Sequence, residues 1–126
     1  MPGQFGIIRG DAGEVLVSAG KAGIISKWRI EPSGTKPDGS PVLRFKCQFS
    51  WVSDVLMGLR INGRDMPKRV RIKMRTERYG LQDVDIVGWD DWRYEGGILY
   101  LENIVHAEGV RERKVSAPSV IKRFNR

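Results

Sequence analysis

Apolar and polar side chains alternate strictly from Leu43 to Trp51, in the stretch LRFKCQFSW. A period of two is the pattern of a β-strand that buries one face and exposes the other. No other part of the chain alternates as cleanly. We therefore expect this stretch to be the central strand of an all-β domain.

A hairpin is predicted on the N-terminal side of this strand. Glu14–Ser18 forms a short strand, the residues AGKAG supply a turn, and Ile24–Ile30 forms a second strand that ends at Pro32. The polar stretch at residues 32–41 follows, with three prolines and two glycines. Loops of this kind on β scaffolds often carry contacts to partners.

Trp28 lies within the second strand of this hairpin. Strict alternation places it on one face with Ile24, Ser26 and Ile30. The apolar neighbours favour a core or sheet-edge anchor over a platform for stacking a ligand.

After the central strand the hydrophobic period changes to that of a helix. We expect one short helix at about residues 53–61, with Ser53 as its N-cap and Asn62-Gly63 as its stop. The apolar positions at i, i+3, i+4 and i+7 are Val52, Val55, Leu56 and Leu59.

A basic stripe follows in the segment KRVRIKMRTERYGLQDVDIVGW. Apolar side chains alternate there with four cations, Arg69, Arg71, Lys73 and Arg75. Such a stripe could follow a phosphate backbone. The alternative is a solvated face that is neutralised by a neighbouring strand.

A turn centred near Tyr79 favours the second alternative. Antiparallel pairing about that turn places Arg75 opposite Asp83 and Lys73 opposite Asp85. Arg69 and Arg71 would then be the free members of the stripe. The same register places apolar residues opposite each other on the other face, in the pairs Met74–Val84 and Ile72–Ile86.

A second hairpin is predicted at Gly96-Gly97, because two adjacent glycines are typical of a two-residue loop. With the glycines at the tip, Tyr94 faces Leu99 and Trp92 faces Leu101.

Composition and charge set the domain organisation. The chain has 126 residues, 40% hydrophobic residues and a net charge of +7, which suits one domain. The tail from residues 109–126 holds six cations against one carboxylate, Glu112, so it carries most of the excess. We divide the chain into an N-terminal arm (1–13), a β-domain (14–108) and a basic C-terminal tail (109–126). We expect synthesis in the cytoplasm, since the N-terminus lacks the blocks of a signal peptide and no apolar run is long enough to span a membrane.

Residues suited to catalysis or metal binding are sparse. His106 is the single histidine and Cys47 the single cysteine, on the apolar face of its strand. Five carboxylates lie within residues 83–95, but their spacing matches no known cation loop. We expect no enzyme activity, no metal and no other cofactor.

Two stretches resemble bacteriophage tail-tube and related virion proteins. GEVLVSAGKAGIISKW is similar to their first hairpin, a short strand, a Gly-containing turn and a strand ending in Ser-x-Trp. VDIVGWDDWRYEGGILYLENI is similar to their closing strands, where a Gly-Trp element precedes a Gly-initiated apolar strand. The resemblance implies a β-sandwich or barrel with extended arms that assembles into a ring, tube or shell. The chain is shorter and more basic than that pattern, which leaves the particle component open.

The fold predicted is therefore mainly β, a single antiparallel β-sandwich or barrel with one short helix and extended N- and C-terminal arms. The function predicted is that of a non-catalytic structural protein of a virion, made in the host cytoplasm and bound to copies of itself or to other virion proteins. No membrane or small-molecule partner is expected. The residues expected to contact other subunits are Phe5, Ile7, Ile8, Lys36, Arg111, Arg113, Lys114, Val120, Ile121 and Phe124.

The alternative is a small OB-like protein that binds single-stranded nucleic acid. The predicted order of three strands, a helix and a further strand is that of an OB-fold. A stacking groove would then be formed by Trp28, Arg69, Arg71, Trp89 and Trp92.

Overall fold

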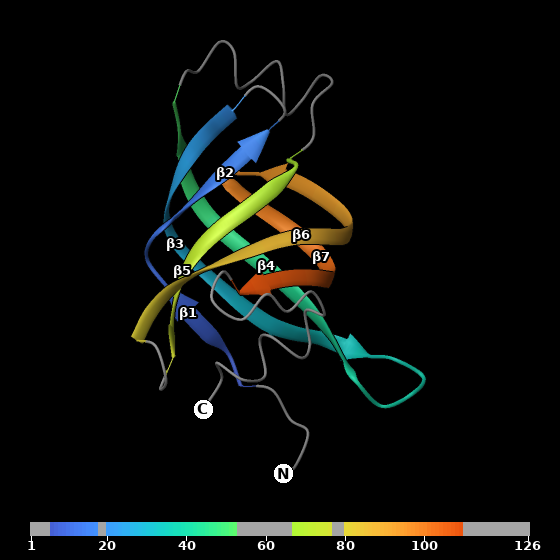
Figure 1. The fold of residues 1–126 in the computed structure, drawn as a ribbon. Helices are drawn as coiled ribbons and strands as arrows, with labels where there is room; N and C mark the ends of the chain where they lie inside the picture. The colour runs from blue at the N-terminus through green and yellow to red at the C-terminus, as the bar shows by residue number, and fades with distance from the viewer. Residues whose placement is uncertain (1–5, 18–19, 53–66, 77–79, 110–126) are drawn as a thin grey trace.

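The computed structural model describes residues 6–17, 20–52, 67–76 and 80–109, and these form seven β-strands (Figure 1). The strands are β1 (Ile8–Gly10), β2 (Gly13–Val17), β3 (Gly20–Thr35), β4 (Pro41–Trp51), β5 (Arg69–Thr76), β6 (Gly80–Glu95) and β7 (Ile98–Gly109). No helix occurs in the described ranges, and the helix predicted at residues 53–61 lies outside them. The mainly β class is confirmed.

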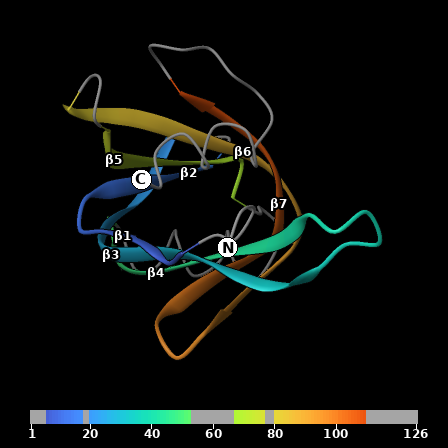
Figure 2. The same ribbon diagram turned by 90° about the horizontal axis from the view of Figure 1, so that it is seen from below.

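Six of the strands close into an antiparallel barrel, and β1 is an additional strand beside β3. Two three-stranded meanders, β2-β3-β4 and β5-β6-β7, join through the pairs β2–β5 and β4–β7 (Figure 2). Closure pairs the edges that each meander would otherwise leave open. An OB-fold has five strands in a Greek-key order, so this strand order is not that of an OB-fold.

Alternate side chains of the strands fill the barrel. On β4 the inward positions Leu43, Phe45, Cys47 and Phe49 are all at most 9% exposed, as the alternation predicts. Trp51 ends this face, and its ring meets that of Phe49 edge-on with centroids 4.5 Å apart. The central-strand prediction is therefore confirmed.

The first hairpin is also present, but a β-bulge changes its faces. The pairing of β3 with β4 shifts between Ile25 and Lys27, and an extra residue in one strand moves all later side chains to the opposite face. Ile25 is consequently buried and Ile24 is 56% exposed. The prediction that Ile24 shares the face of Trp28 is wrong, whereas the burial of Trp28 is confirmed.

The strand β3 does not end at Pro32. It continues to Thr35 and pairs with β4 as far as Pro41, with a register shift next to Pro32 that accommodates the missing N–H. The loop predicted at residues 32–41 is thus reduced to residues 36–40. Residues 31–35 and 41–44 pair only with each other among the described strands. Residues 32–42 of this ribbon protrude from the barrel, whereas Glu31 and Leu43 are buried (Figures 1 and 2).

The hairpin between β5 and β6 has the predicted faces but a different register. Thr76 pairs with Gly80, so the turn lies earlier than Tyr79 and the register is displaced by two residues. Lys73 therefore lies opposite Asp83, and the predicted pairs of Arg75 with Asp83 and Lys73 with Asp85 are wrong. A displacement of two keeps every side chain on its own face.

The hairpin at Gly96-Gly97 is confirmed in full. Tyr94 pairs with Leu99 and Trp92 with Leu101. Both glycines have positive φ values, 59° and 81°, which a two-residue loop of this kind requires.

Gly10 allows β1 to lie against β3, because a Cβ at this position would overlap the indole ring of Trp28. We predict that Gly10→Ala lowers the free energy of unfolding by about 1–3 kcal/mol, the usual cost of overpacking. Urea denaturation measures this change.

Gly34 provides the matched control, since its Cβ would have nothing closer than 3.9 Å and its φ is not positive. Gly34→Ala should leave the stability within about 0.5 kcal/mol of the native value. Adding Trp28→Phe to Gly10→Ala should cost less than the two separate changes together. Equal losses for Gly10→Ala and Gly34→Ala would contradict this account.

Candidate functional site

A broad, open groove of about 680 Å³ lies against β1, β3, β4 and β5. Six cationic side chains line it: Arg9, Lys27, Arg29, Lys46, Lys73 and Arg75. We call this surface the basic groove. Among the described residues that line it, Asp11 supplies the only carboxylate.

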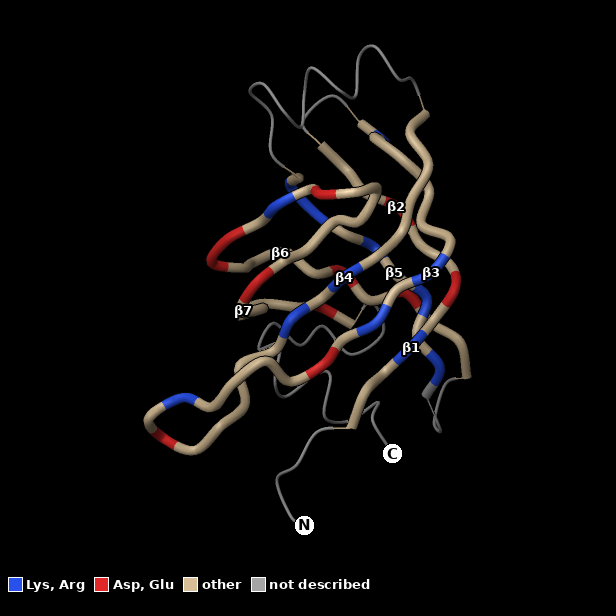
Figure 3. Tube along the Cα trace, turned by 180° about the vertical axis from the view of Figure 1, so that it is seen from behind, with Lys and Arg blue, Asp and Glu red and all other residues tan. Residues whose placement is uncertain are grey.

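The pattern of outward side chains explains why the cations meet. Lys27 and Arg29 point outward from β3, and Lys46 points outward from β4, because their neighbours Trp28 and Cys47 are buried. Figure 3 shows the Lys and Arg segments of β1, β3 and β4 side by side on one wall of the barrel. The antiparallel pairing of these strands thus concentrates positive charge on that wall.

Two of the six cations are neutralised by carboxylates. Lys73 Nζ lies 2.7 Å from Asp83 Oδ1, and Arg29 Nε lies 2.5 Å from Glu31 Oε1, although without the alignment of a hydrogen bond. Arg9, Lys27, Lys46 and Arg75 form no ion pair with any carboxylate that the structure describes. Among the described residues, the charge of these four cations is therefore uncompensated.

A network of charged side chains supports one side of the groove. Glu31 is buried between two arginines, and Arg44 Nη2 donates to Glu31 Oε2 at 2.7 Å. That hydrogen bond and the charge of Arg29 hold the pKa of Glu31 below its ordinary value of 4.5. The network continues through Glu102, which accepts from Arg93 at 2.6 Å. Glu31 thereby fixes the position of Arg29.

The buried wall of the groove offers little reactivity. Trp28 is 3% exposed, and its indole Nε1 has no hydrogen-bond partner among the described residues. Burial raises the pKa of the Cys47 thiol to about 12, so the thiol stays protonated and inert near neutral pH. The groove therefore provides positive charge and hydrogen-bond donors.

The basic stripe predicted on β5 is largely neutralised. Arg71 binds Asp85 with two hydrogen bonds of 2.7 and 2.9 Å, and this contact raises the pKa of Arg71. Arg69 Nη1 lies 3.9 Å from the same carboxylate. The prediction that Arg71 is a free cation is therefore wrong. Arg75 instead has no carboxylate partner in the described parts of the chain.

The five residues of the predicted stacking groove do not come together. Of these, only Trp28 lines the basic groove, and it is buried. Trp89 and Trp92 are half-buried and pack against the core from β6. Arg69 and Arg71 lie on β5 beside Asp85.

The residues predicted to contact other subunits are placed only in part. Ile7 is 46% exposed, Ile8 is half-buried at the start of β1, and Lys36 lies at the tip of the ribbon. The remaining seven lie outside the described residues: Phe5, Arg111, Arg113, Lys114, Val120, Ile121 and Phe124.

Carboxylates at residues 83–95 bind side chains of the neighbouring strands β5 and β7. Asp83 and Asp85 bind Lys73 and Arg71, while Asp90 accepts a hydrogen bond from the Asn103 amide. Within the described parts of the chain no group of three histidine, cysteine or acidic side chains could hold a metal ion.

Four cations of the groove were not predicted from the sequence: Arg9, Lys27, Arg29 and Lys46. A signal was present, since KWR and RFK each place two cations around one buried aromatic residue. Pairing those two segments with each other would have placed the cations together. The stretch at residues 32–41 separates these two segments, so no short turn indicates their pairing.

No family model, curated protein or solved structure matches this chain. Among the described residues no helix is long and apolar enough to cross a membrane.

The buried position of Glu31 gives a pH-dependent stability. Its pKa is lowered in the folded protein, so its contribution is complete above the unfolded pKa and is lost as the pH falls through the folded pKa. We predict that Glu31→Gln lowers the free energy of unfolding at pH 7 by about 1–3 kcal/mol. The difference from the native protein should shrink below about pH 4.5.

Urea denaturation between pH 3 and pH 7 measures both effects. Glu95→Gln is the control, because the Glu95 side chain is 69% exposed and a surface pair contributes little. A difference between Glu31→Gln and native protein that stays constant over this pH range would count against the prediction.

Proposed function

We propose that the protein is a non-catalytic binding protein whose basic groove holds the phosphate backbone of a nucleic acid. The observation that carries the proposal is the set of four cations in the groove without a carboxylate partner among the described residues. Elsewhere on the barrel wall, arginine side chains bind carboxylates of neighbouring strands. Cations that are left unpaired in a concave surface attract polyanions and raise their rate of association.

The lining favours contacts to phosphates over contacts to bases. Trp28 is the only aromatic residue among the described residues of the lining, and its indole is buried. Stacking therefore has no exposed ring to use there. Binding should depend on phosphate charge, respond strongly to salt and discriminate little between sequences.

Replacing unpaired cations tests this function. We predict that Lys27→Gln with Arg75→Gln weakens binding of a labelled single-stranded oligonucleotide about tenfold at ~50 mM salt, because two phosphate contacts are lost. The slope of log K against log salt should fall by about 1.4, that is about 0.7 for each contact. Fluorescence anisotropy over a salt series measures both quantities.

Lys68→Gln with Lys21→Gln is the control, because it removes the same charge from side chains outside the groove. It should leave the affinity within about twofold, apart from the long-range effect of net charge. Equal losses for the two double variants, or no binding by the native protein at ~50 mM salt, would exclude the groove as a nucleic-acid site.

A second candidate is the predicted role in assembly, and the protruding ribbon favours it. The outer part of this ribbon, residues 32–35 and 41–42, extends beyond the barrel, and its two strands pair only with each other among the described strands. A two-stranded ribbon is only marginally stable alone, and a neighbouring subunit could bury it. The resemblance to virion proteins rests on the stretches that form β2–β3 and β6–β7, and membership of a virion remains a prediction of that resemblance.

Shortening the ribbon tests assembly. Replacing residues 33–42 by Asn-Gly would join the paired residues Pro32 and Leu43 through a two-residue loop. We predict that this variant loses self-association in sedimentation velocity while the barrel keeps its thermal unfolding transition. A native protein that sediments as a monomer at high concentration would rule out self-assembly through the ribbon.

A further inference from the structure

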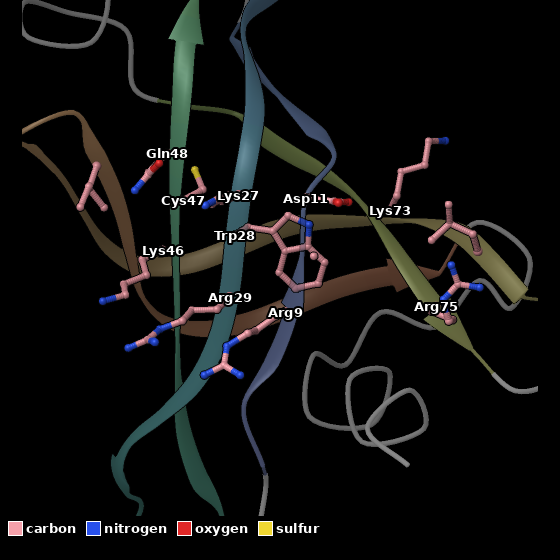
Figure 4. A pocket seen from close by; sticks show the side chains of 13 residues that line it. Arg9, Asp11, Lys27, Trp28, Arg29, Lys46, Cys47, Gln48, Lys73 and Arg75 are labelled. Carbon is pink, nitrogen blue, oxygen red and sulfur yellow. The ribbon is translucent and has the colours of Figure 1, made fainter.

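Three cations of the basic groove stand in one row across three adjacent strands. Arg9 on β1 pairs in register with Arg29 on β3, and Arg29 pairs in register with Lys46 on β4. All three side chains point away from the barrel interior. Figure 4 shows them extending the same way, whereas Lys73 and Arg75 stand on β5.

Such a row costs stability, because like charges directly opposite each other on neighbouring strands repel. The barrel places opposite charges at comparable positions, as in the pairs Glu31–Arg44, Arg71–Asp85 and Lys73–Asp83. The row is therefore not explained by folding alone.

Two acidic pairs on the barrel provide a comparison. Asp85 lies opposite Glu108, and Asp91 lies opposite Glu102. In each pair an arginine binds one member, so among the described residues a single carboxylate is left without an ion pair. In the basic row only Arg29 contacts a carboxylate of the described residues, and on each side of it stands a cation without such a contact.

Arg29 is held in place at the centre of the row. Glu31 contacts its Nε, and Arg44 holds the other oxygen of Glu31. The two terminal nitrogens of Arg29 have no hydrogen-bond partner among the described residues. A planar guanidinium binds the oxygens of a phosphate with two parallel hydrogen bonds. Arg9 and Lys46 flank that position.

We propose that Arg9, Arg29 and Lys46 form a discrete site for one phosphate group. The inference rests on the proposed function, since it assigns the contact that a single phosphodiester of a nucleic acid would make in the groove. Binding of the anion would remove the repulsion within the row. The bound phosphate should therefore stabilise the folded protein as well as being recognised by it.

Thermal unfolding in sodium phosphate, compared with sodium chloride at the same ionic strength, tests the site. Phosphate should raise the Tm of the native protein by about 5 °C when the site is filled. Arg9→Gln and Lys46→Gln should each lose most of this rise. In chloride both variants should melt no lower than the native protein, because each substitution relieves repulsion.

Lys27→Gln and Arg75→Gln are the controls, as both residues line the groove outside the row. They should keep the full response to phosphate. The site is overturned if the native protein and the two row variants respond equally, or if the native protein does not distinguish phosphate from chloride.

Competition separates this inference from the proposed function. Phosphate that displaces a bound oligonucleotide from the native protein, but not from Lys46→Gln, identifies the row as a phosphodiester site. If the protein responds specifically to phosphate but binds no oligonucleotide, the result supports the phosphate site as a site for free phosphate. The same result excludes the nucleic-acid function. If oligonucleotide binding requires Lys27 and Arg75 but not the row, the result supports the nucleic-acid function and contradicts the discrete phosphate site.

Discussion

Two pairings between strands that lie far apart in the sequence close the barrel. The pairs β2–β5 and β4–β7 join two meanders, and a single interior then decides which face of every strand is buried. Inward positions such as Phe45 and Ile86 are fully buried. The outward positions are fixed by the same pairing, so the charge pattern of the wall is a consequence of closure. Arg9, Arg29 and Lys46 lie together because the interior requires Gly10, Trp28 and Cys47 to face inward.

The sequence predicted faces more reliably than registers, for a physical reason. Alternation has a period of two, so it separates inside from outside but does not distinguish registers that differ by two residues. The expected pairing of Met74 with Val84 matched apolar residues, whereas the structure places Gln82 opposite Met74. Gln82 is buried without a side-chain hydrogen-bond partner among the described residues. The Gly96-Gly97 hairpin was predicted correctly because two glycines fix both the loop length and the register.

The candidate site was harder to predict because it depends on contacts distant in sequence. The β5 stripe was visible as a run of alternating cations, yet the structure shows that Asp83 and Asp85 neutralise much of it. The basic groove needs β1, β3 and β4 side by side, and no short turn joins β1 to β3. The bulge in β3 also reverses the faces of that strand after Ile25, which simple alternation cannot show. Cations separated along the chain therefore become neighbours only when β1 and β4 pair with β3.

The wall of the barrel thus carries two arrangements of charged side chains, a chain of opposite charges and a row of cations. Glu31, Arg44, Glu102 and Arg93 form a chain of opposite charges across β3, β4, β7 and β6, and this arrangement supports the fold. The row beside it has the same strand geometry, but no carboxylate in the described part of the chain pairs with Arg9 or Lys46. Natural sequences depart from local consistency mainly at functional sites. Glu31 belongs to the chain of opposite charges and also contacts Arg29, the central member of the row. The stabilising network therefore also positions the centre of the row, which folding alone does not explain.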